Sequence, residues 1–140
     1  MHDTRKASAT LWTVQGLLAL LFLFTGGMKL ILPIEMLKGP VPLPELFVRF
    51  IGLAEVAGAI GLILPGLLRV RPSLTPLAAT GLVTIMTGAT VVTLEGGMVG
   101  PALVPLIVGL LATYVAYGRR QWAPPARSIS YPDVRRISRA

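Results

Sequence analysis

Four blocks of apolar residues run through the 140-residue chain, and each is as long as the ~20 residues that an α-helix needs to cross a lipid bilayer. Inside lipid there is no water to satisfy backbone N–H and C=O groups, so a spanning segment must bond to itself, as a helix does. The sequence therefore predicts an all-α fold, a bundle of four transmembrane helices at about 11–32, 46–64, 74–94 and 99–117.

Composition supports a single membrane domain over residues 1–122. Hydrophobic residues make up 54% of the chain and charged residues only 14%, whereas a soluble domain carries about a quarter charged residues. Residues 123–140 differ, because this segment is polar, rich in Pro and Arg, and without helical periodicity, which predicts a short disordered basic tail. Its arginines either attract anionic lipids or serve only as a topological anchor.

Proline and glycine mark the predicted ends of the helices. Pro33 is expected to end the first helix, and Pro65-Gly66 the second. Gly96-Gly97 predicts a tight turn into the fourth helix, and Pro105 predicts a kink inside that helix.

Lysines and arginines gather on one side of the predicted bundle. The connections after the first and third helices carry only Lys38, whereas the two ends of the chain and the middle connection carry Arg5, Lys6, Arg69, Arg71, Arg119, Arg120, Arg127, Arg135, Arg136 and Arg139. Basic residues concentrate on the cytoplasmic side of membrane proteins. Both ends of the chain are therefore predicted to lie in the cytoplasm (N-in/C-in), in a multi-pass protein of the cell membrane.

Several classes of function are disfavoured by what the sequence lacks. The chain has no cysteine, so it has no disulfide, thiolate metal site or cysteine nucleophile, and its one histidine, His2, lies at the N-terminus. The net charge of +7 is explained by topology, and no nucleic-acid-binding motif accompanies it. No phosphate loop, nucleophile elbow or pair of carboxylates is present. We therefore predict no catalytic residues, no metal site and no nucleic-acid partner, and an enzyme is the least supported class.

Three charged residues lie within or beside the first two predicted helices: Lys29, Arg49 and Glu55. A carboxylate at membrane depth costs at least ~2.5 kcal/mol, so Glu55 must pair with a cation, be protonated or face the bundle interior. Three interpretations stay open. The charges form a buried ion pair that fixes the helix register, they form a ligand or proton site, or they reach the interface without pairing.

Small residues accompany these charges. Gly52, Gly58 and Gly61 recur around Glu55 at intervals of three residues, which predicts a narrow groove that another helix can approach closely. On the first helix, Gly26 shares a face with Lys29, so the two grooves are expected to meet with Lys29 over Glu55. Lys29 lies nearer the membrane surface than Glu55, so two alternatives stay open: the lysine side chain reaches down to the carboxylate, or Arg49 competes for it.

Two stretches of the sequence resemble the DoxX-like family of small membrane proteins: Leu-Phe-Leu-Phe-Thr-Gly-Gly-Met-Lys-Leu (21–30) and Arg-Phe-Ile-Gly-Leu-Ala-Glu-Val-Ala-Gly-Ala-Ile-Gly-Leu-Ile-Leu-Pro (49–65). Shorter matches at 74–82 and 115–119 extend the resemblance over about residues 10–120. It implies a four-helix bacterial membrane bundle and places the three charges at the family's recurrent polar positions. Thr93 stands where many relatives have His, so no role of that His is carried over. The family's name comes from a subunit linked to thiosulfate and quinone oxidation.

Three functional hypotheses follow from the resemblance and the residues. The first is a non-catalytic membrane subunit or scaffold associated with redox or stress-response enzymes, with a homo-oligomer also open. The second is a binder or carrier of a small lipophilic or anionic molecule such as a quinone, which would be the only cofactor. The third is a small proton-coupled exporter, and a lysine near Glu55 argues against it, because an exporter needs a freely titrating carboxylate.

Overall fold

Four long helices make up the protein. The computed structural model describes residues 2–39 and 41–122, and these form α1 (His2–Ile31), α2 (Glu45–Leu68), α3 (Leu74–Glu95) and α4 (Val99–Arg119), with short 3-10 turns at Ile34–Leu37 and Arg120–Trp122. Each of the four helices is long and apolar enough to cross a membrane, and no strand occurs in the described part of the chain. The predicted all-α fold with four membrane-spanning helices is confirmed. The predicted tail, 123–140, lies outside the described residues.

One predicted helix end is wrong. Pro65 does not end the second helix, because α2 continues through it to Leu68 and stops at Arg69, whose left-handed backbone (φ 52°) lets its N–H donate to the Pro65 carbonyl. Proline removes the backbone hydrogen bond to the carbonyl four residues earlier, and membrane helices tolerate this loss. In the same turn the Leu62 carbonyl, which is not the one that Pro65 leaves without a donor, accepts a 2.6 Å hydrogen bond from the Gln15 side chain and so ties the end of α2 to α1.

The first helix also begins earlier than its apolar block, at His2 rather than near residue 11. The added segment is exposed over residues 5–10 and contains lysine and alanine, which favour helix without help from packing. Pro105, in contrast, lies inside α4 as expected.

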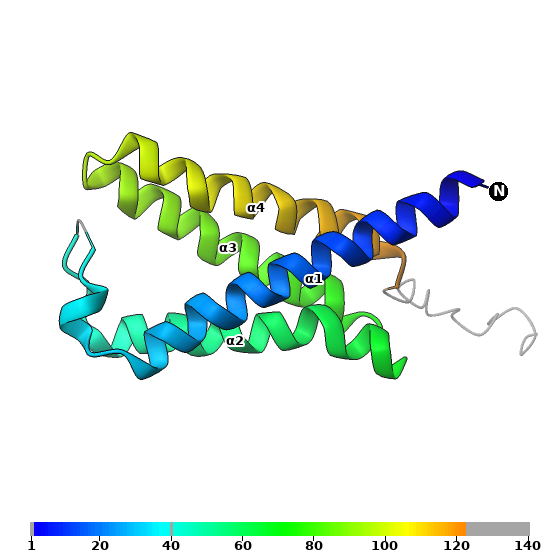
Figure 1. The fold of residues 1–140 in the computed structure, drawn as a ribbon, viewed down its shortest axis with the longest axis horizontal. Coiled ribbons are helices and arrows are strands. Elements are labelled where there is room, and N and C mark those ends of the chain that lie inside the picture. Colours follow the sequence, from blue (N-terminus) through cyan, green and yellow to red (C-terminus); the bar gives the residue numbers. More distant parts are fainter. Residues whose placement is uncertain (1, 40, 123–140) are drawn as a thin grey trace, which may run out of the picture.

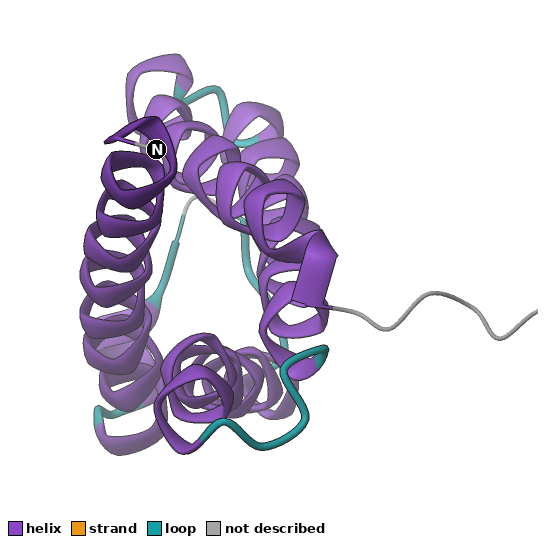
Figure 2. Cartoon of the chain, turned by 90° about the vertical axis from the view of Figure 1, so that its right-hand side faces the viewer, coloured by secondary structure: helices purple, strands orange, loops and turns teal. Residues whose placement is uncertain are grey.

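The helices form a ring in which each contacts its two neighbours. α1 packs against α2 and α4, and α3 packs against the same two helices (Figure 2). The connection between α1 and α2 and the turn between α3 and α4 lie at one end of the molecule, which we call the loop end (Figure 1). The start of α1 and the end of α4 lie at the other end, the terminal end. Toward the loop end, the α1–α2 pair and the α3–α4 pair diverge (Figure 1).

A thin apolar core holds the ring together, and much of the remaining apolar surface faces outward. The buried core residues include Phe22, Leu62 and Leu82. Large side chains such as Leu20 and Leu110 are 67% and 62% exposed. In a soluble protein such a surface would aggregate, whereas in a bilayer it contacts lipid tails.

We expected Gly52, Gly58 and Gly61 of α2 to form a single groove. Instead, these glycines face two different helices, α1 and α3. A Cβ atom on Gly52 would lie 2.8 Å from Lys29 Cβ on α1, whereas Cβ atoms on Gly58 and Gly61 would lie 2.6–2.7 Å from Leu82 and Ala78 on α3. A helix turns by about 100° per residue, so a step of three residues drifts by about 60°. Over three such steps the small residues move to the opposite face of α2 and therefore meet different neighbours.

Candidate functional site

An ion pair joins α1 and α2 near the loop end. Lys29, in the last turn of α1, places Nζ 2.8 Å from Glu55 Oε1 and 2.7 Å from Oε2, and the Thr25 hydroxyl lies 3.4 Å from Oε2. The Glu55 side chain is only 1% exposed, whereas the Lys29 side chain is 29% exposed. The carboxylate is therefore enclosed, whereas part of the Lys29 side chain remains accessible from the outside.

Two glycines bring the charges within reach of each other. A Cβ atom on Gly26 would lie 2.8 Å from the Gly52 carbonyl oxygen, so the α1 and α2 backbones approach more closely than any side chain would allow. This contact lies one turn from Lys29 on α1 and one turn from Glu55 on α2. The sequence places Lys29 and Glu55 at different depths in the membrane. They still meet, because α1 and α2 touch at this point and the long lysine side chain covers the remaining distance to the carboxylate.

Arg49 does not compete for Glu55, so of the two alternatives the one in which Lys29 reaches the carboxylate holds. Its NH1 group donates to the backbone carbonyls of Lys29 at 2.6 Å and Leu32 at 2.8 Å, and its NH2 group lies 3.2 Å from Glu45 Oε1. The last carbonyls of a helix have no partner within that helix, and a cation there also complements the negative end of the helix dipole. Arg49 therefore caps the end of α1 and fixes the turn that carries Lys29.

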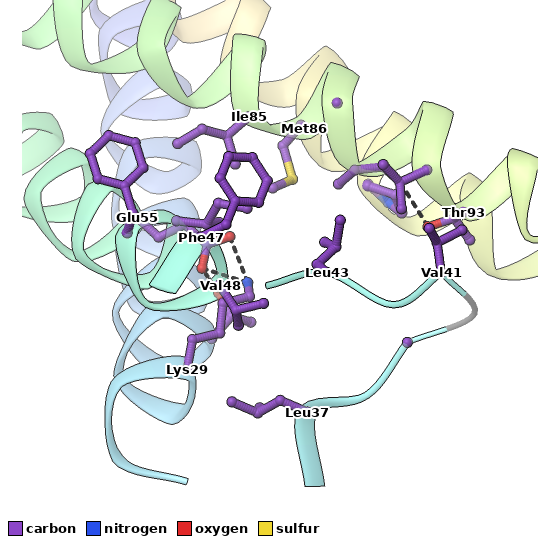
Figure 3. A pocket seen from close by; sticks show the side chains of 18 of the residues that line it. Lys29, Leu37, Val41, Leu43, Phe47, Val48, Glu55, Ile85, Met86 and Thr93 are labelled. Atoms are coloured by element: carbon purple, nitrogen blue, oxygen red, sulfur yellow. Dashed lines mark hydrogen bonds and ion pairs between the residues drawn. The ribbon is translucent and has the colours of Figure 1, made fainter. Parts of the chain in front are cut away.

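A cavity of about 750 Å³ opens beside the ion pair (Figure 3). All four helices and the connection between α1 and α2 line it. Lys29 and Glu55 lie on one side, Ile85, Met86 and Thr93 of α3 on the other, and Leu37, Val41 and Leu43 of the connection border it (Figure 3). The volume falls within the range of ~300–1,000 Å³ that is usual for sites that bind small molecules.

The polar atoms on the cavity wall differ in whether they can donate a hydrogen bond to a ligand or accept one from it. Lys29 has three N–H donors and directs two of them at Glu55. Among residues 2–39 and 41–122, no acceptor is found for the third. On α3, the hydroxyl groups of Thr84 and Thr93 donate to the carbonyls of Thr80 and Ala89 in their own helix, so they retain only acceptor capacity. The donor side of the cavity is therefore the α1 side.

The model of one protein family matches residues 13–115, a range that contains most of all four helices and all three charges of the site. The chain belongs to the DoxX-like family. This confirms the resemblance seen in the sequence, and with the four apolar helices it makes the protein a multi-pass membrane protein. Comparisons with curated proteins and with solved structures gave no match.

This DoxX-like protein has a second polar cluster, at the terminal end, that our sequence analysis missed. Gln15 is fully buried, and its Oε1 accepts a 2.6 Å hydrogen bond from Nε of the buried Arg119, while its amide nitrogen bonds the Leu62 carbonyl. The Arg119 guanidinium also lies 5.1 Å from the centre of the Trp12 ring. A lone glutamine in an apolar span needs a hydrogen-bond partner, and that signal could have identified the cluster.

The two clusters differ in what they can do chemically. The terminal cluster joins α1, α2 and α4 through the hydrogen bonds of Gln15, and neither Gln15 nor Arg119 lines the cavity of about 750 Å³. Residues 2–39 and 41–122 bring no three His, Cys, Asp or Glu side chains together, so we propose no metal site. The cluster at the loop end combines polar groups with a volume that a small molecule could fill.

Proposed function

We propose that this DoxX-like protein binds one small lipophilic molecule in the cavity at the loop end. The observation that carries the proposal is the cavity itself, a space of about 750 Å³ whose wall is apolar except for the ion pair, a second lysine and a few threonines. Ligand sites are typically apolar with a few placed polar groups. A charged pair at membrane depth is costly to maintain, and such residues usually serve a function.

The other hypotheses have less support. Glu55 is bonded by Lys29 through both carboxylate oxygens, whereas a proton-coupled exporter would need a carboxylate that no fixed cation holds. A subunit or scaffold of redox or stress-response enzymes remains a prediction, as do a quinone cofactor, a homo-oligomer and binding of anionic lipids by the tail. Binding of a lipophilic molecule is compatible with a role beside such enzymes, and the cavity supports it.

A pair of glycines on α3 allows a controlled test of the cavity. Gly88 lines the cavity, and Gly81 lies two turns earlier on the same helix and does not. A Cβ atom at either position meets no atom within 4 Å, so a larger side chain is tolerated at both. Gly88→Phe should fill part of the cavity, whereas Gly81→Phe should leave it open.

We expect an amphiphile to co-purify with the wild-type protein from native membranes at about one molecule per chain, and to be detected by mass spectrometry of the extracted protein. Gly81→Phe should retain it, and Gly88→Phe should lower its occupancy about tenfold, which corresponds to ~1.4 kcal/mol of binding free energy. Equal occupancy in the two variants would contradict the proposed function, provided that both show the melting temperature of a folded protein in detergent.

We also propose that both ends of the chain lie in the cytoplasm of a bacterial cell, which would place the loop end and its cavity on the outer side. The support is the distribution of lysine and arginine. Because the chain has no cysteine, Gly39→Cys and Ser130→Cys give single labelling sites. A membrane-impermeant maleimide should label Gly39→Cys in intact cells and label Ser130→Cys only after lysis. The reverse pattern would invert the topology.

A further inference from the structure

The ion pair presents its positive member to the cavity. From this we infer, on the basis of the proposed function, that the ligand is an amphiphile with an anionic, hydrogen-bond-accepting head such as a carboxylate, bound with its head at Lys29. Both residues line the cavity, but the Lys29 side chain is 29% exposed and the Glu55 side chain only 1%, so a ligand there contacts mainly the lysine of the pair.

The third N–H of Lys29 gives that head a defined place. Lys29 directs two donors at Glu55, and the described residues offer no acceptor for the remaining one. Hydrogen bonds to charged groups are stronger than those between neutral groups. A ligand oxygen could accept from this third donor, whereas a protonated amine, which has only donors, could not.

Net charge favours the same class of head. The ionisable side chains that line the cavity are two lysines, Lys29 and Lys38, and one carboxylate, Glu55. Glu55 balances one of the two positive charges, so one remains uncompensated within the lining. Lys38 lies in the connection between α1 and α2, on the loop-end side of the cavity. An anionic head would neutralise this remaining positive charge, and a cationic head would increase the net positive charge of the site.

The opposite wall determines the direction in which the ligand lies. The Thr84 and Thr93 hydroxyls donate to their own helix and cannot donate to a ligand. An accepting head therefore has donors only on the α1 and connection side, and its apolar body would extend toward Ile85, Met86 and Val108.

Three probes of equal chain length separate the head from the body: dodecanoate, dodecanol and dodecylamine. Their binding would be measured as radiolabelled compounds on the full-length protein in phosphatidylcholine nanodiscs, with empty nanodiscs subtracted, at an alkaline pH that keeps the carboxylate ionised. We expect dodecanoate to bind at least about tenfold more tightly than dodecylamine, the factor that a charge-assisted hydrogen bond supplies. Dodecanol should bind between the two.

Variants then assign the preference to the two lysines. Lys38→Gln should weaken dodecanoate binding about threefold, as expected for a partly screened charge, whereas Lys6→Gln, an exposed lysine outside the cavity lining, should have no effect. The double variant Lys29→Met/Glu55→Gln removes both charges together, so neither is left unpaired, and it should abolish most of the preference for dodecanoate.

The outcomes separate the two proposals. If dodecylamine binds as tightly as dodecanoate, and Gly88→Phe abolishes the binding of both, the cavity binds ligands but the inference about the head is wrong. A dodecanoate preference that survives in the double variant with Lys38→Gln added would also overturn it. If no probe shows binding that Gly88→Phe abolishes, the proposed function fails and the inference fails with it.

Discussion

Glu55→Gln should lower the free energy of unfolding by about 3–5 kcal/mol, the loss seen when one member of a buried ion pair is removed. The reason is that Lys29 would keep its positive charge beside an apolar wall with no carboxylate to balance it. Lys29→Met should cost a similar amount, because it leaves the Glu55 carboxylate, which is 1% exposed, without its cation. Both losses can be measured by thermal melting or denaturant titration in a fixed detergent.

The double variant Lys29→Met/Glu55→Gln should be more stable than the sum of the single losses implies, because neither charge remains. Glu45→Gln is the matched control, since Glu45 also pairs with a cation, Arg49, but its side chain is 57% exposed. An exposed pair of this kind contributes less than about 1 kcal/mol. If the Lys29/Glu55 cycle is additive within about 0.5 kcal/mol, the two charges do not act as a pair.

Gly26→Leu should be the most damaging single substitution at a glycine. A Cβ atom there would lie 2.8 Å from the Gly52 carbonyl oxygen and 3.0 Å from the Glu55 and Val56 side chains. Backbone cannot move aside as a flexible side chain can, so α1 and α2 must separate. Overpacking usually costs about 1–3 kcal/mol, and here separation would also lengthen the Lys29–Glu55 contact. We therefore expect a loss of at least ~3 kcal/mol in the same melting assay.

The next residue along the chain is the control. A Cβ atom on Gly27 meets no atom within 4 Å, so Gly27→Leu should change stability little or raise it slightly, because leucine favours helix more than glycine does. If Gly26→Leu and Gly27→Leu melt at the same temperature, the close contact between α1 and α2 does not exist as described.

The four spanning helices could be predicted because the length of an apolar block is a direct physical requirement of the bilayer. The ends of the helices were harder to predict, because the local preferences of proline and glycine compete with contacts between helices. Pro65 was expected to stop α2, yet the helix continues through it to Leu68, and in that turn the Gln15 side chain of α1 donates to the Leu62 carbonyl. No pattern within residues 46–68 reveals this contact with another helix.

The residues of the candidate site were identifiable, whereas their partners were only partly so. Lys29, Arg49 and Glu55 stood out because charge in lipid is costly, and an ion pair was one of three open interpretations. The role of Arg49 stayed open, because its partners are backbone carbonyls at the end of α1, and carbonyls are present in every residue and leave no signature in the sequence. The spacing of Gly52, Gly58 and Gly61 at multiples of three residues was interpreted as a single helix face. Residues at this spacing in fact rotate around the helix, so these glycines face different neighbours.

The cavity could not be predicted at all. It lies where the α1–α2 pair and the α3–α4 pair diverge toward the loop end, and its wall is formed by residues from five separate segments of the chain. An empty volume depends on how helices cross and not on the identity of any one residue. The sequence could therefore suggest a binder of a lipophilic molecule, but it could not show where such a molecule would fit.

The most direct test of a ligand-binding cavity is to map where a bound amphiphile lies. Dodecanoate with a diazirine at the end of its chain would be photolysed with the protein in nanodiscs, and the labelled peptides identified by mass spectrometry. We expect the label on the cavity wall, at Ile85, Met86 or Val108, and we expect both excess dodecanoate and Gly88→Phe to suppress it. Label confined to outward-facing residues such as Leu20, Leu103 and Leu110, and unchanged by Gly88→Phe, would contradict the account.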